Sequence, residues 1–177
     1  MRCWIKHLSR TIFYNRIYIT TTTKVRYRMS MINAQTITDL VVLAVIVLAL
    51  DAVFLYSISN MFSRQIMLVQ GSALKVNIPS AAICYLLIVV GMYYFVLRHI
   101  IVPNASSVAA SIQNMRLREG MITAFFLGVM VYGVYETTTL ALLRNWSPVT
   151  AVIDTTWGGT LFALSAYLFH MYKSMDS

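Results

Sequence analysis

The amino-acid sequence predicts an all-α, polytopic membrane protein built as a bundle of four transmembrane helices. Of its 177 residues, 59% are hydrophobic and 11% are charged, whereas soluble domains average about 45–50% apolar and about 25% charged residues. Four apolar runs are long enough to cross a bilayer, which takes roughly 20 residues in a helix. Four such helices with short connections fill a chain of this length and leave no room for a second domain.

Residues 1–36 form a basic N-terminal extension without a single acidic residue. Seven of the 14 Lys and Arg residues lie in its first 28 positions. The four threonines at positions 20–23 disfavour a helix, because β-branched side chains lose rotamer freedom there. Three interpretations stay open: an organellar targeting segment, a basic tail lying on anionic lipid, and an upstream start codon, with Met29 or Met31 as the true first residue.

The first span is predicted at about 37–59 and the second at about 78–102, because uninterrupted apolar length indicates a membrane helix. A polar connection at 60–77 separates the two spans. Pro79 falls in the first turn of the second span, where its missing N–H costs nothing. Pro103 is expected to end that span.

A polar, Ser-rich connection, in which we expect a short surface helix, precedes the third span at about 120–143. A tight turn then leads to the fourth span at about 148–170. Ser147 can cap the N-terminus of that helix, and Pro148 suits its first position. Residues 173–177 form a short tail.

The distribution of basic residues predicts that both termini lie in the cytoplasm. With four spans, the N-terminal extension, the second connection and the C-terminal tail share one side of the membrane. They carry seven, three and one of the Lys and Arg residues, which leaves three on the other side. The positive-inside rule assigns the richer side to the cytoplasm. Basic residues beside apolar runs are topology signals, so we expect the lipid bilayer as a partner and no nucleic acid. The kind of membrane, bacterial, organellar or viral, and the oligomeric state stay open.

Three carboxylates lie inside the predicted spans: Asp51, Glu136 and Asp154. An acid in hydrocarbon costs roughly 2.5–3.5 kcal/mol on insertion scales and marks a functional site by default. Each acid lies about six to eight residues from the outer end of its span, or roughly 9–12 Å below the interface. The topology therefore predicts one layer of acids, in which Glu136 and Asp154 lie on antiparallel neighbouring helices and can face each other.

Two interpretations of this layer remain open. Carboxylates this close together cannot all stay ionised, so the layer could bind a proton, a cation, a small polar ligand or a lipid headgroup, in transport or in a lipid-linked role. Trp157 would then act as a lid over Asp154. Alternatively, the acids form a structural hydrogen-bonded knot, and the protein is a non-catalytic membrane scaffold or assembly subunit. The hydroxyl groups available for such a knot belong to Tyr132, Tyr135, Thr137, Thr138, Thr139, Thr155 and Thr156.

The cysteines and histidines give weaker signals. Cys3 and Cys84 provide neither a disulfide framework nor a zinc-binding spacing, and Cys84 is expected to be a small buried apolar residue. His99 and His170 lie at cytoplasmic helix ends but are poor evidence for a metal site.

The remaining motifs predict no metal and no cofactor. No nucleophile elbow, phosphate loop or zinc-protease motif occurs, so no reaction is assigned. Trp146 fits an interfacial aromatic belt. Four glycines are expected to allow close helix packing: Gly128, Gly133, Gly158 and Gly159.

A set of residues in the first, third and fourth spans matches the pattern of a known family. The matching residues are Asp51 and Leu55, then Tyr132, Tyr135, Thr138, Ala141, Leu143 and Trp146, then Asp154, Trp157, Gly158 and Thr160. With these residues the chain resembles the DUF2177 family of small membrane proteins, which has bacterial and eukaryotic or viral relatives. The resemblance covers about residues 38–167 and implies a four-helix integral membrane protein, but no particular activity. The family has Asp where Glu136 stands and Asn where Thr139 stands, so the carboxylate moves by about one methylene and an amide donor and acceptor are lost.

Overall fold

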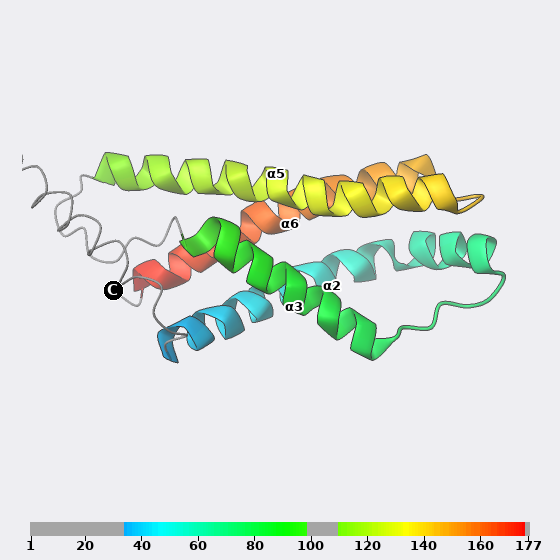
Figure 1. Cartoon of the computed structure of the whole chain (residues 1–177), viewed down its shortest axis with the longest axis horizontal. Coiled ribbons are helices and arrows are strands. Elements are labelled where there is room, and N and C mark those ends of the chain that lie inside the picture. The colour runs from blue at the N-terminus through cyan, green and yellow to red at the C-terminus, as the bar shows by residue number, and fades with distance from the viewer. Residues whose placement is uncertain (1–33, 99–109, 176–177) are drawn as a thin grey trace, which may run out of the picture. The chain divides into compact units, whose positions relative to one another are not determined.

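The structure is a computed structural model that describes residues 34–98 and 110–175, and these residues form helices without a strand. The predicted all-α, four-helix fold is confirmed. Some features of the sequence lie outside the described residues: the basic extension up to residue 33, which includes Cys3, and also His99 and Pro103. The helices are α2 (Ala34–Gln70), α3 (Ile78–Met92) with a π-helical continuation η1 (Tyr93–Leu97), α5 (Ala110–Leu142) and α6 (Pro148–Met175), as Figure 1 shows.

Three helical stretches are long and apolar enough to cross a membrane: α2, Ile78–Leu97, and the Met115–Leu142 part of α5. Helix α6 is also long enough, but among the described residues it is not one of the three stretches that are apolar enough. It buries more residues than any other helix in the described part of the chain, including the polar Thr150 and Ser165. These two polar side chains therefore pack inside the protein rather than against lipid.

Three helices extend beyond the predicted spans, because apolar length predicts the membrane-crossing part of a helix and not its ends. Helix α6 ends at Met175, inside the tail that was expected at 173–177. Helix α2 continues from the expected end near Ser59 to Gln70. Gly71 follows in the left-handed conformation, at φ 69°, and its N–H donates to the Met67 carbonyl over 2.9 Å. Helix α5 begins at Ala110, so the described part of the expected surface helix is the first part of α5.

The predicted starts of the second and fourth helices are confirmed. Asn77 Oδ1 accepts a hydrogen bond from the Ser80 N–H over 3.2 Å, and Pro79 lies in the first turn of α3. Ser147 Oγ accepts from the Thr150 N–H over 3.4 Å at the start of α6. These side chains satisfy N–H groups that have no partner inside the helix.

Helices α5 and α6 lie side by side (Figure 1) and make the most extensive contact between any two described helices. The predicted role of glycine is confirmed here: a Cβ on Gly128 would lie 2.2 Å from the Gly158 carbonyl oxygen. A Cβ on Gly158 would lie 2.3 Å from the Tyr132 ring. At Gly133 the approach is ordinary, with 3.4 Å to a Thr155 methyl group.

The apolar core lies on one side of the acids. Its residues precede Asp51 on α2 and Glu136 on α5, and they follow Asp154 on α6, as expected for helices that alternate in direction. Beyond the core, Lys173 Nζ lies 3.2 Å from Asp39 Oδ1. The buried core residues are Leu43, Val47, Val89, Met92, Val96, Leu97, Ala124, Leu161, Phe162, Ala166 and Phe169.

Candidate functional site

Asp51 ties three helices together. It is buried on α2 and accepts hydrogen bonds from Tyr85 Oη of α3 over 2.5 Å and from Trp157 Nε1 of α6 over 2.8 Å. The Phe54 ring stacks on Trp157, with ring centroids 4.3 Å apart. Trp157 therefore lies on Asp51, and not over Asp154 as the sequence predicted.

Replacing Tyr85 with phenylalanine is expected to lower the free energy of unfolding by about 1–2 kcal/mol. One oxygen of buried Asp51 then loses its donor, which is costly for a charged group. Reversible unfolding in mixed detergent micelles, followed by circular dichroism, measures the change. Tyr56→Phe on the exposed surface of α2 is the matched control. Equal stability of the two variants would contradict a stabilising role for the Tyr85 hydroxyl.

Glu136 is completely buried on α5, and only one of its oxygens has a partner. Trp146 Nε1 donates to Oε2 over 2.8 Å, while Oε1 has no hydrogen-bond partner among the described residues. Trp146 is only 6% exposed, so its ring packs inside the protein. The turn between α5 and α6, which carries Trp146, also contacts α2. Gln65 Nε2 donates to the Asn145 carbonyl over 2.6 Å, and Phe62 packs edge-on against Trp146.

Asp154 interacts with both of the other acids. Its carboxyl group is within hydrogen-bonding range of Glu136, and it also interacts electrostatically with Asp51. The three carboxyl groups of α2, α5 and α6 are therefore linked through Asp154. They differ in their surroundings, since Asp51 has two donors and Glu136 has one.

The threonine hydroxyls do not bind the acids. Those of Thr137, Thr138, Thr139 and Thr156 donate to carbonyl groups of their own helices, one turn earlier. The donors to the carboxylates are instead Tyr85, Trp146 and Trp157, of which the first two were missed. Tyr85 lies about as far from the start of its helix as the acids lie from the outer ends of theirs. Counting residues from the helix ends could therefore have identified Tyr85 as a donor at the level of the acids.

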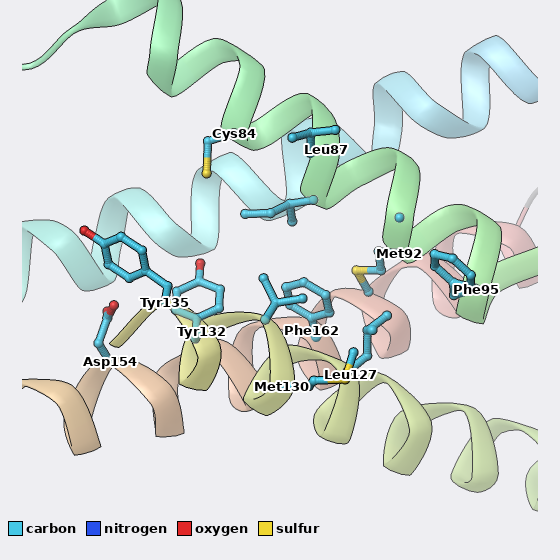
Figure 2. Close-up of a pocket in the computed structure, with 13 residues that line it drawn as sticks. Cys84, Leu87, Met92, Phe95, Leu127, Met130, Tyr132, Tyr135, Asp154 and Phe162 are labelled. Carbon is cyan, nitrogen blue, oxygen red and sulfur yellow. The ribbon is translucent and has the colours of Figure 1, made fainter. Parts of the chain in front are cut away.

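A cavity of about 540 Å³ is lined by α3, η1, α5 and α6. Figure 2 shows Asp154, Tyr132 and Tyr135 at one end and Phe95 at the other. Cys84 also lines this cavity and is exposed, so the prediction of a small buried residue is wrong. The apolar lining residues are Leu87, Ile88, Met92, Phe95, Leu127, Met130, Val131 and Phe162, with Gly91 among them.

The cavity has one acidic group and no basic one. Among the described lining residues, Asp154 is the only Asp or Glu, and there is no Lys, Arg or His. Asp51 and Glu136 do not line it. In the described part of the chain, no three His, Cys, Asp or Glu side chains are grouped so that they could hold a metal ion. The arrangement offers a carboxyl group and two phenol hydroxyls beside an apolar surface.

Comparison with known proteins gives one match. The model of the family described as "Predicted membrane protein (DUF2177)" matches residues 36–171, which include all three acids and both tyrosines of the cavity. No curated protein and no solved structure matches the chain.

Proposed function

This chain belongs to the DUF2177 family of predicted membrane proteins, and from that premise we propose that it binds an amphiphilic molecule in the cavity beside Asp154. The polar head of the molecule lies at Asp154, Tyr132 and Tyr135, and its apolar chain extends toward Phe95. The observation that carries this proposal is the separation of polar and apolar groups along one cavity within apolar helices. Such binding serves either transport of the molecule or a reaction at its head.

The walls suit a lipid-like chain rather than a water-soluble metabolite. The cavity volume of about 540 Å³ falls in the range of roughly 300–1,000 Å³ that is common for small-molecule sites. Met92 and Phe162 at its floor are buried, whereas Leu87 and Phe95 are 67% and 62% exposed. Exposed apolar residues at the rim of a membrane-spanning segment allow entry from the bilayer.

The polar end selects the head group by charge. A carboxyl group without a basic neighbour in the lining repels anions and favours a hydroxyl donor or a cation. Aromatic rings such as those of Tyr132 and Tyr135 also attract cations. We therefore expect alcohols or amines, and not fatty acids, as occupants.

The backbone of α3 also supports a binding site. The turn from Tyr93 to Leu97 is π-helical, a rare distortion that is frequent at functional sites. One of its residues, Phe95, lines the cavity. Gly91 lines it as well, and a Cβ there would meet no atom within 4 Å. The glycine leaves space that a side chain could fill.

Filling this space tests the proposal. A diazirine-bearing dodecanol, photoactivated with the full-length protein in phosphatidylcholine vesicles, is expected to label Leu87–Phe95 and Leu127–Val131, and excess dodecanol is expected to compete. Gly91→Phe should reduce this competable labelling about tenfold, which corresponds to a loss of about 1.4 kcal/mol of binding free energy. Mass spectrometry of the digested protein measures the labelled sites.

Ala82→Phe is the matched control, because Ala82 lies on the same helix, is exposed and does not line the cavity. It adds the same side chain and should leave the labelling at the wild-type level. Labelling that dodecanol cannot compete, or that both variants reduce equally, would contradict a binding site in this cavity.

A second candidate function is a membrane scaffold, in which the acids only hold helices together. The observation that favours it is Asp51, whose two donors come from two other helices and which does not line the cavity. The labelling experiment separates the two functions, because a scaffold predicts no competable labelling of the cavity walls.

A further inference from the structure

One oxygen of Glu136 points to a further property of this site. Glu136 is 0% exposed, and only its Oε2 atom accepts a hydrogen bond, from Trp146. Its Oε1 atom is buried without a partner in the described part of the chain. A buried carboxylate oxygen without a donor is costly, so a donor in this position would stabilise the protein.

The surroundings of Glu136 contain a second carboxyl group. Asp154 of α6 is within hydrogen-bonding range, and Asp51 of α2 adds a negative charge that acts on Asp154. Tyr132 and Tyr135 are the other titratable groups beside Asp154, and Cys84 lines the same cavity. Tyr85 donates its hydroxyl to Asp51. None of these groups is a cation, and no Lys, Arg or His of the described residues lines the cavity.

We infer that Glu136 and Asp154 share a single proton, and that a cationic head group bound at Asp154 displaces it. The proton supplies the missing donor between the two carboxyl groups, so that only one of them is charged. This inference rests on the proposed amphiphile binding and adds the charge of the head group and the release of a proton.

The exchange conserves charge. Before binding, the pair carries one net negative charge, because one O–H bond holds the shared proton. On binding, this O–H bond breaks, the proton passes to water, and two carboxylates face one cation. The site again carries one net negative charge. With the proton retained, the cation would face only one carboxylate, which attracts it less strongly than two carboxylates do. Loss of the proton without a cation would leave two buried like charges in contact.

Dodecyltrimethylammonium tests this inference, since its charge does not change with pH. Its affinity is measured by competition against the diazirine-bearing dodecanol in the vesicle assay above. We expect the affinity to increase with pH by up to tenfold per pH unit while the free pair holds its proton, and to level off above that range. Dodecanol, which is uncharged, should compete equally at every pH.

Two further measurements follow the proton itself. A pH indicator in weakly buffered solution should record about one proton released per cation bound. The infrared C=O band of a protonated carboxylic acid should be present in the empty protein and disappear with dodecyltrimethylammonium but not with dodecanol. In Asp154→Asn, with helix content checked by circular dichroism, the proton release and the pH dependence should both be lost.

The outcomes are distinguishable. If dodecanol labels the cavity but the cation binds with the same affinity at every pH and releases no proton, the shared proton is wrong and the proposed function stands. If a protonated-acid band persists unchanged in Asp154→Asn with the cation added, the proton belongs to another group and the inference is also wrong. If neither compound competes for the cavity, the proposed function itself fails.

Discussion

Gly128→Ala is expected to force α5 away from α6 and to lower the free energy of unfolding by about 3 kcal/mol. The added methyl group would lie 2.2 Å from the Gly158 carbonyl oxygen, which is backbone and cannot rotate away. Overpacking of a filled interface costs roughly 1–3 kcal/mol, and a rigid neighbour places this site at the upper end. Unfolding in mixed micelles measures the loss.

Gly133→Ala provides the matched control on the same helix. A methyl group there would meet only a Thr155 methyl group at 3.4 Å, which is an ordinary contact. Alanine also restricts the unfolded chain and favours a helix by about 0.5–1 kcal/mol relative to glycine. The control is therefore expected to be neutral or slightly more stable. Similar losses in both variants would show that close approach at Gly128 is not the cause.

Trp157→Ala is expected to lower the free energy of unfolding by about 3 kcal/mol. The change removes the N–H donated to Asp51 and the ring stacked on Phe54, two contacts that join α6 to α2. Truncation of buried Trp or Phe costs roughly 3–5 kcal/mol, and the half-buried position of Trp157 favours the lower end of this range. The same unfolding assay applies.

Trp157→Phe separates the two contributions. A phenyl ring can still stack on Phe54 but has no N–H to donate, so we expect a loss of about 1 kcal/mol, in line with one interhelical hydrogen bond. Because Trp157 does not line the cavity, dodecanol competition should be unchanged in this variant. A Phe variant as unstable as the Ala variant would assign the whole effect to the hydrogen bond.

The sequence predicted the fold and the positions of the acids well, because both depend on local patterns. Apolar length located the four helices, and Pro79, Ser147 and Pro148 located two helix starts. Counting residues along each helix predicted that Asp51, Glu136 and Asp154 share one layer. In the structure, Asp154 interacts with both of the other acids.

The partners of the acids could not be predicted, because they depend on the rotation of each helix about its own axis. A helix that is apolar on all sides gives no periodic signal for which side faces inward. Tyr85 and Asp51 are 34 residues apart, and Trp157 and Asp51 are 106 apart. The threonines were expected to bind the acids, but a threonine in a helix can donate to its own backbone, and four of them do so.

Helix α6 is not among the described stretches that are apolar enough to cross a membrane by themselves, which has a consequence for how the chain enters the membrane. Helix α5 is synthesised first, and only the residues between Leu142 and Pro148 separate it from α6. When α6 leaves the ribosome, the surface that receives its glycines and polar side chains is therefore already beside it. The two helices can insert as one hairpin, so that the least lipid-compatible helix never has to partition into the bilayer alone.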